Sequence, residues 1–171
     1  MNQSSVKQQV LHFLEQNNIP YYIFEHSPAH TIQECLDMPF IDDQITICKN
    51  ILLCNRQQTN VFLLLLKPLT PFRTSVVSKK LGVSRLSFAP PEMLEDKLHL
   101  KSGSLSPLGL LFDPEHNIKL CYEEDIKQTP RIAFHPCDNT ATVIFDQDVF
   151  WYQLLPKLKI TPICLSLAEN D

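Results

Sequence analysis

Glycine is scarce in this chain: only three of its 171 residues are glycine. Glycine permits positive φ and a close approach of the backbone to a ligand, at an entropic cost. Two of the three, Gly103 and Gly109, bracket the short stretch Gly-Ser-Leu-Ser-Pro-Leu-Gly. We therefore expect a loop at 103–109 whose backbone conformation the protein needs.

Long apolar runs and a leader pattern are also missing. The longest apolar run, Val61–Leu66, is far too short to cross a bilayer and predicts a buried strand. The segment Met1–Lys7 lacks the charged and then apolar pattern of a secretion signal. We therefore expect a soluble cytoplasmic protein that makes no membrane contact.

Close cysteine pairs are absent as well. The six cysteines stand at 35, 48, 54, 121, 137 and 164, and no two of them form a CxxC pair. Thiols stay reduced in the cytosol, so these cysteines predict small buried side chains rather than disulfides. A zinc site needs paired ligands at short spacing, and His135 with Cys137 comes nearest without meeting that pattern. We expect neither a metal nor a cofactor.

GxGxxG, Walker and GxSxG motifs are missing, which disfavours the common nucleotide-binding folds and the hydrolase elbow. The net charge of −4 argues against a protein that coats duplex nucleic acid, because such a protein needs a basic face. Recognition of one nucleic acid end by a few well-placed cations is compatible with this charge.

What the sequence contains is an irregular alternation of helix and strand patterns. The length suits one domain over 1–171, and the pattern predicts a mixed α/β fold with a largely antiparallel central sheet flanked by helices. Helices are predicted at 4–17, from Thr31, at 74–81, at 91–98 and after Asp146. Strands are predicted at 21–24, 45–54, 61–67, 85–88, 108–112, 117–122, 131–135 and 140–145. We expect N-caps at Thr31, Thr74 and Asp146, a left-handed closure at Gly82, and a hairpin between 45–54 and 61–67.

Lys49 stands inside an otherwise apolar strand pattern, Ile45–Leu53. Strict alternation would place Ile45, Ile47, Lys49 and Ile51 on one face. A lysine on an apolar face is costly if it is unpaired. It is therefore either an edge-strand charge that discourages aggregation or a cation that meets an anion such as a phosphate. The strand pattern does not decide between these two interpretations.

His135 lies between Phe134 and Pro136, in an apolar setting. Such a histidine is commonly a hydrogen-bonded core residue, and the alternative is substrate orientation or proton transfer near neutral pH. The triplet Asp138-Asn139-Thr140 that follows it favours a turn.

The small residues of the 103–109 loop leave backbone N–H groups that could bind an anion or a developing oxyanion. Ser104 and Ser106 are candidate nucleophiles, but the sequence shows no base paired with them. A role in the loop itself is therefore the first interpretation of both serines.

Three motifs, taken in order, resemble a known family. Lys49-Asn50, Gly103-x-x-x-Pro107 and Phe134-His135-Pro136-x-Asp138-Asn139-Thr140 are similar to motifs of the YbaK/prolyl-tRNA synthetase-associated editing domains. The best match within this family is the free-standing PrdX branch, the ProXp-ala type. The resemblance covers a core from about residue 5 to residue 158 and leaves 159–171 as a tail. Two departures are Cys137, where asparagine is common, and Ile51-Leu52-Leu53, where Leu-Phe-Leu is more usual.

The resemblance implies a YbaK-like fold and hydrolysis, in trans, of tRNA(Pro) that carries a wrong amino acid. The branch is associated with alanine and YbaK itself with cysteine. The implied partner is the aminoacylated 3′ end of tRNA, with prolyl-tRNA synthetase as a further candidate, and no oligomeric state is predicted. The candidate catalytic residues are Lys49, Asn50, Gly103, Ser104, Ser106, Pro107 and His135. The candidate substrate-binding residues are Thr31, Ile32, Ile45, Gly109, Phe134, Asn139 and Thr140.

In this hypothesis Lys49 binds the phosphate or ribose region of the terminal adenosine, and His135 orients the aminoacyl group or the ribose. Asn50 hydrogen-bonds the substrate or holds the neighbouring loop. Backbone N–H groups of 103–106 face the ester carbonyl, and Pro107 stiffens the loop. No side chain stands out as a general base, so the attacking water is helped by the 2′-hydroxyl of the substrate. A small pocket narrowed by apolar side chains admits alanine and excludes proline.

Three alternatives stay open at this point. The first is deacylation of Cys-tRNA(Pro) or of another small mischarged amino acid. The second is a catalytically silent tRNA-binding module, and the third is an unrelated thiol hydrolase that uses Cys48 or Cys137.

Overall fold

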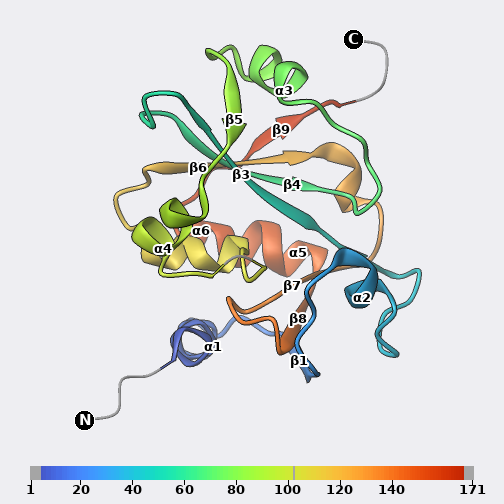
Figure 1. Cartoon of the computed structure of the whole chain (residues 1–171). Coiled ribbons are helices and arrows are strands. Elements are labelled where there is room, and N and C mark those ends of the chain that lie inside the picture. Colours follow the sequence, from blue (N-terminus) through green and yellow to red (C-terminus); the bar gives the residue numbers. More distant parts are fainter. Residues whose placement is uncertain (1–4, 102, 168–171) are drawn as a thin grey trace.

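Two β-sheets form the frame of the computed structural model, which describes residues 5–101 and 103–167 (Figure 1). Sheet A has the strand order β1-β8-β7-β2 and sheet B the order β5-β3-β4-β6-β9. The strands are β1 (Tyr22–Glu25), β2 (Ile45–Ile47), β3 (Lys49–Asn55), β4 (Val61–Leu66), β5 (Leu86–Phe88), β6 (Ile118–Glu123), β7 (Arg131–Phe134), β8 (Ala141–Asp146) and β9 (Ile163–Leu165). The pairs β2–β7, β4–β6 and β6–β9 are parallel and the other pairs antiparallel. The mixed α/β class is confirmed, but its strands divide between two sheets rather than one.

The predicted strand 45–54 is interrupted at Cys48, and this interruption separates the sheets. Its first part, β2, pairs with β7, and its second part, β3, pairs with β4 and β5. The prediction of one continuous strand over 45–54 is therefore wrong, since Ile45 and Ile47 belong to sheet A and Lys49 belongs to sheet B. Alternation holds only within one continuous strand, and here the chain leaves sheet A and enters sheet B. Lys49 and Asn50 consequently stand at the junction of the two sheets.

The helices follow the predicted positions closely. They are α1 (Val6–Gln16), α2 (Ile32–Leu36), α3 (Thr74–Leu81), α4 (Pro91–Leu98), α5 (Gln147–Val149) and α6 (Leu155–Lys157), and the π turn η3 (Phe150–Leu154) joins α5 to α6. Thr31 caps α2 as predicted, and Gly82 ends α3 with φ +68°. Thr74 and Asp146 do not cap: Thr74 is the first helical residue of α3, and the Asp146 side chain makes no capping bond. No helix in the described ranges is long and apolar enough to cross a membrane.

The predicted strand at 108–112 is instead the 3₁₀ helix η1 (Pro107–Phe112). The apolar run there is short enough to fit either structure, and proline at the first helical position together with a capping serine decides it. The Oγ of Ser106 accepts a hydrogen bond from the Leu108 N–H at 3.2 Å. A second short 3₁₀ helix, η2 (Glu124–Lys127), follows β6.

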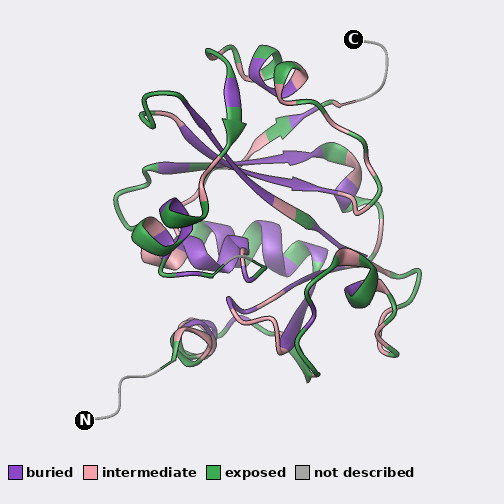
Figure 2. Cartoon of the chain, viewed as in Figure 1, coloured by how far each residue is buried: buried purple, intermediate pink, exposed green. Residues whose placement is uncertain are grey.

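The buried residues are coloured purple in Figure 2, and the hydrophobic ones among them form three clusters. The largest lies between the sheets and includes Leu63 of sheet B, Phe145 of sheet A and Phe150 of η3. The second packs Val77 of α3 against the other face of sheet B. The third and smallest packs Cys35 of α2 against sheet A. The elements that carry the predicted motifs therefore surround the junction of the two sheets.

Candidate functional site

A cavity of about 420 Å³ opens beside the junction of β2 and β3. This volume is within the range of small-molecule sites in proteins. Its walls come from α2 and the residues before it, the β2–β3 junction, β5, α4, the glycine loop and the ends of β7 and β8. The lining residues are Ala29, His30, Thr31, Ile32, Cys35, Ile47, Cys48, Lys49, Asn50, Ile51, Leu52, Phe88, Ala89, Leu94, Gly103, Leu105, Ala133, Phe134, His135 and Thr142.

Four of the predicted catalytic residues meet at this cavity: Lys49, Asn50, Gly103 and His135. They come from three places in the sequence that the two sheets and the glycine loop bring together. Three predicted substrate-binding residues also line it: Thr31, Ile32 and Phe134.

The other predicted site residues lie outside the lining. Ser106 is fully buried and caps η1, and Ser104, which is 8% exposed, uses its backbone N–H to bond the Lys101 carbonyl at 3.1 Å. These placements do not suit a nucleophile or an oxyanion contact. Pro107 begins η1, and Gly109 packs inside the protein, where an added Cβ would lie 2.9 Å from Leu100 Cδ1.

Ile45, Asn139 and Thr140 also lie away from the cavity. Ile45 lines a second hollow, of about 370 Å³, beside Tyr22 and Phe24. The carbonyls of Asn139 and Thr140 accept hydrogen bonds from Ala29 and His26. These two residues therefore hold the segment that leads into α2, and they support the cavity wall from behind.

A compact turn at Asp138–Thr140 ends the motif that begins at Phe134. Asp138 Oδ1 accepts hydrogen bonds from the backbone N–H and the hydroxyl of Thr140, at 2.9 and 2.6 Å. Burial of Asp138 opposes its ionisation, but the bonds from Thr140 outweigh this and hold the carboxyl pKa below its usual value. Cys137 has φ +62°, in the left-handed region that asparagine adopts more readily than cysteine.

His135 is held in one tautomer by the backbone. Its Nδ1 lies 2.8 Å from the Ala141 carbonyl oxygen, which can only accept, so Nδ1 carries the proton. Its Nε2 lies 3.6 Å from Cys35 Sγ, inside the cavity lining. Burial lowers the pKa of His135, the nearby His26 ring acts in the same direction, and the bond to Ala141 opposes them. The ring is therefore neutral near pH 7 and presents an acceptor nitrogen.

Sequence reasoning missed the residues that surround this imidazole. Cys35 lines the cavity on α2, and burial raises the pKa of its thiol, with Glu34 acting in the same direction. The His26 ring lies 5.9 Å from the His135 ring, and its Nε2 lies 2.8 Å from the hydroxyl of Thr142. Long-range packing of α2 on sheet A brings these groups together, and no local pattern indicates it.

Lys49 is exposed at the mouth of the cavity, with its Nζ 5.9 Å from the centre of the Phe72 ring. Phe72 in turn makes an edge contact with Phe88, which lines the cavity and is 63% exposed. The cation needs no buried counter-ion, because its ammonium group remains in contact with water.

Asn50 has an acceptor without a partner. Its Nδ2 donates to the Cys48 carbonyl at 3.1 Å, whereas its buried Oδ1 has no hydrogen-bond partner in the described structure. A buried acceptor left unpaired costs free energy, and a donor on a bound molecule would remove that cost.

The cysteines and histidines form no metal cluster in the part of the chain that the structure describes. All six cysteines are free, and all are buried except the exposed Cys164. Burial raises the pKa of Cys137 to about 12 and moves that of Cys48 still higher. Thiolates are the nucleophilic form of cysteine, so neither residue is prepared for attack.

Comparison with known proteins identifies the family. The family model of the aminoacyl-tRNA editing domain matches residues 26–150. The prolyl-tRNA editing protein ProX of Acetoanaerobium sticklandii is 29% identical over 142 residues, covering 83% of this chain and 86% of that protein. The prolyl-tRNA synthetase associated domain-containing protein 1 of Danio rerio is 26% identical over 164 residues, covering 94% of this chain and 87% of that protein.

A solved structure described as a proposed trans-editing enzyme for prolyl tRNA synthetase has the same fold. It superposes with a TM-score of 0.73 at 17% identity and covers 99% of this chain and 100% of its own. The family match, over residues 26–150, includes every residue that lines the cavity, and the editing activity of this family is the deacylation of aminoacyl-tRNA. The chain therefore belongs to the aminoacyl-tRNA editing domain family, the YbaK/ProX family.

Proposed function

We propose that this protein hydrolyses the ester of mischarged tRNA(Pro), with Ala-tRNA(Pro) as its main substrate. The observation that carries the proposal is the convergence of Lys49, Gly103 and His135 on one cavity. Relatives named for prolyl-tRNA editing and for association with prolyl-tRNA synthetase, at 29% and 26% identity, support the choice of tRNA(Pro).

The terminal adenosine enters from the side of Lys49 and Phe88. The exposed ammonium of Lys49 meets the phosphate or ribose of this nucleotide as a point charge. The exposed ring of Phe88 offers a surface on which the adenine stacks. Both contacts hold the substrate without touching the reacting carbonyl.

The aminoacyl ester lies deeper, between the glycine loop and His135. Gly103 and Leu105 line the cavity, and their backbone N–H groups are the candidates for the ester oxyanion. The neutral Nε2 of His135 exchanges its contact with the Cys35 thiol, at 3.6 Å, for a hydrogen bond from the α-amino group or from the ribose 2′-hydroxyl. Asn50 also lines the cavity, and its Nδ2 holds the neighbouring Cys48 carbonyl.

The ester is already activated, so positioning and charge stabilisation are worth more than a strong protein nucleophile. The site contains a neutral imidazole and thiols whose pKa values burial has raised. Attack by water, assisted by the 2′-hydroxyl of the substrate, fits these groups. A substrate that ends in 2′-deoxyadenosine should be hydrolysed much more slowly, and undiminished turnover would exclude this role of the hydroxyl.

Size selects the amino acid. An activating site for proline cannot strongly reject a smaller side chain, because each missing methylene is worth about 1–3 kcal/mol. The cavity of this protein, whose walls include Ile32, Leu94 and Phe134, reverses the selection of the activating site: it admits alanine and excludes the larger ring of proline. The cognate Pro-tRNA(Pro) is therefore spared.

Deacylation of Ala-, Cys- and Pro-tRNA(Pro), measured side by side, tests the proposal. We expect rapid loss of alanine, slower loss of cysteine and no loss of proline above the buffer rate. Preference for cysteine would identify the alternative substrate. Binding of tRNA without hydrolysis of any of the three esters would identify a silent binding module.

A further inference from the structure

The charges of this chain are strongly segregated along the sequence. Residues 44–91 contain seven of the fifteen lysines and arginines and none of the nineteen aspartates and glutamates. The remainder carries all nineteen acidic residues with only eight basic ones. A net charge of −4 therefore hides one basic segment inside an acidic protein.

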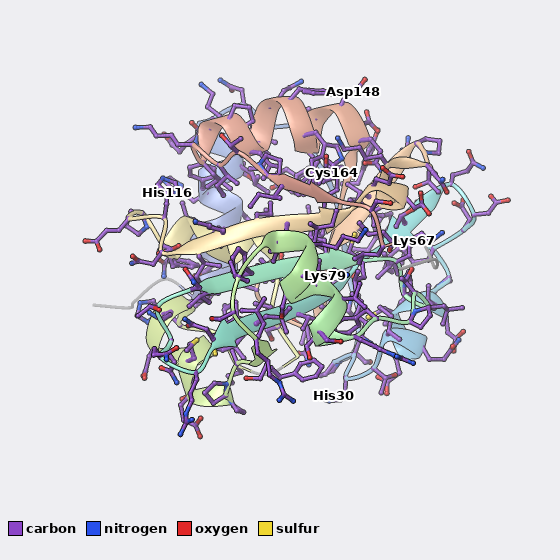
Figure 3. The ribbon with its side chains drawn as sticks, turned by 90° about the horizontal axis from the view of Figure 1, so that it is seen from above. His30, Lys67, Lys79, His116, Asp148 and Cys164 are labelled. Atoms are coloured by element: carbon purple, nitrogen blue, oxygen red, sulfur yellow. The ribbon has the colours of Figure 1, made fainter. Side chains whose placement is uncertain are left out.

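The fold gathers this segment on one side of sheet B. It forms β3, β4, α3 and β5, and α3 covers the face of the sheet that is turned away from sheet A (Figure 1). In Figure 3, which looks down on the molecule from this side, Lys79 is seen on α3. Lys79, Arg73 and Arg85 are all exposed.

The basic residues extend from the cavity mouth towards the tip of the β3–β4 hairpin. Lys49 contacts Phe72, and Arg73 follows Phe72 directly and precedes α3. At the far end, Asn55 pairs with Leu86, so the neighbouring residues Arg56 and Arg85 lie at the same end of their two strands. Because α3 has eight residues, this row is about 12 Å long along the helix alone.

These charges are not neutralised within the protein. No ion pair joins Arg56, Arg73, Lys79 or Arg85 to a carboxylate in the described ranges 5–101 and 103–167. A patch of unpaired like charges repels itself and lowers the stability of the compact state. An anionic partner that crosses the patch would remove this repulsion.

We infer that this row, which we call the α3 basic surface (Arg56, Arg73, Lys79 and Arg85), binds the phosphate backbone of the tRNA acceptor stem. The inference rests on the proposed function, because it takes the 3′ end to lie in the cavity that Lys49 marks. A duplex presents a closely spaced row of phosphates, which lysine and arginine neutralise with release of counterions. Such contacts position the substrate and do not read its sequence. The surface therefore governs affinity for tRNA, and the cavity governs which ester is cleaved.

The test is the triple charge reversal Arg73→Glu, Lys79→Glu and Arg85→Glu. Binding of uncharged tRNA(Pro) is measured over a series of salt concentrations, together with hydrolysis of two substrates, Ala-tRNA(Pro) and alanyl-adenosine. We expect at least a tenfold weaker Kd for tRNA at low salt and a salt slope that is shallower by about one for each phosphate that the variant no longer binds. The KM for Ala-tRNA(Pro) rises similarly, whereas hydrolysis of alanyl-adenosine is unchanged because this ester fills the cavity without reaching the surface.

The matched control reverses three exposed lysines elsewhere, Lys119→Glu, Lys157→Glu and Lys159→Glu, with the same change in net charge. It should bind tRNA(Pro) nearly as well as the unchanged protein. A milder variant, with glutamine at positions 73, 79 and 85, keeps the inference testable if the charge reversal unfolds the protein. It should give a smaller loss of tRNA affinity in the same direction.

Each outcome decides one of the two claims. Equal tRNA affinity and salt slope in the triple variant and the control would overturn the basic-surface inference, and the surface would then suit an acidic protein partner. If the unchanged protein hydrolyses neither ester, the proposed function fails, and the binding series still decides whether tRNA uses this surface. Loss of alanyl-adenosine hydrolysis in the triple variant would show that the substitutions disturb the cavity, and it would also count against the inference.

Discussion

The Nε2 of His135 faces the Sγ of Cys35 across 3.6 Å, and the two residues are a hundred positions apart in the chain. Because Nδ1 is bonded to the Ala141 carbonyl, Nε2 is the acceptor and the thiol is the donor. The pair is neutral, since burial raises the pKa of the thiol and lowers that of the imidazole. The geometry thus resembles a cysteine–histidine catalytic pair, but its protonation is that of a structural and substrate-orienting contact.

Cys35→Ala tests this interpretation of the pair. We expect the variant to lose less than tenfold in kcat, because the thiol is not the attacking group. Removal of a true nucleophile costs about 10⁴ or more. Single-turnover deacylation of Ala-tRNA(Pro) measures the difference, and the Cys48→Ala, Cys137→Ala double variant serves as a control for the other buried thiols. A loss of the larger size in either variant would point to a thiol hydrolase.

The neutral state of His135 predicts an unusual pH profile. An ordinary histidine has a pKa near 6.5, and burial lowers that of His135. The kcat of hydrolysis should therefore stay constant as the pH falls to 6.5 and should decline only at pH values below 6.5. The measurement is kcat against pH from 5 to 8. A decline that begins above pH 6.5 would show that the ring is not in the environment described.

The same shift predicts how folding stability depends on pH. The folded pKa is depressed, so below about pH 6.5 the unfolded chain binds a proton that the folded protein does not. This group then costs stability as the pH falls, by at most about 1.4 kcal/mol per pH unit, and has no effect above 6.5. Urea unfolding from pH 5 to 8 should give a steeper acid loss for the natural protein than for His135→Gln. Equal slopes would contradict the assignment.

Lys49→Ala should lower kcat/KM for Ala-tRNA(Pro) by about 10–100-fold, the value of one charge-assisted contact. The free energy of unfolding of this variant should differ from that of the unchanged protein by no more than about 0.5 kcal/mol. The reason is that the Lys49 side chain is exposed and makes no ion pair in the described ranges. Lys49→Arg keeps the charge and should recover part of the activity. Unfolding of Lys49→Ala would instead favour a structural role of this charge.

The two glycines of the loop should respond differently to alanine. Gly103 has φ +91° and open space around it, so Gly103→Ala strains the backbone by about 1–3 kcal/mol and distorts a residue of the cavity lining. Gly109→Ala places a Cβ 2.9 Å from the buried Leu100 and should cost about 1–3 kcal/mol through overpacking alone. Denaturation and deacylation rates, measured together, should show reduced activity in folded Gly103→Ala and near-normal activity in folded Gly109→Ala. The reverse order would refute this division of roles.

Ser106→Ala should cost about 0.5–2 kcal/mol of stability, because it removes the cap of η1. Its kcat should change little, since the hydroxyl is fully buried and lies outside the cavity. Thermal unfolding and single-turnover hydrolysis report the two effects separately. Abolished chemistry in a folded variant would make this serine a candidate nucleophile again.

The sequence predicted most elements because each has a strong local cause. The Thr31 cap, Gly82 and the apolar runs of β3 and β4 determine their own structure nearby. What it did not predict depends on distant partners. The interruption at Cys48 exists because β2 pairs with β7 while β3 pairs with β4, and neither partner is visible in the run 45–54.

The candidate site shows the same division. Motif resemblance located Lys49, Gly103 and His135. Cys35 reaches the imidazole only because α2 packs on sheet A, and His26 only because it follows β1, which pairs with β8. The α3 basic surface was missed for a different reason. The net charge argued against such a face, but charge counted by segment, rather than over the whole chain, would have indicated it.

A crystal structure of the protein with a non-hydrolysable alanyl-adenosine, in which an amide replaces the ester, tests the central claim most directly. We predict that the adenosine lies beside Lys49 and Phe88 and that the alanyl group lies between Gly103 and His135. Binding of the analogue in the hollow beside Tyr22 and Phe24, or no binding at millimolar concentration, would contradict the account.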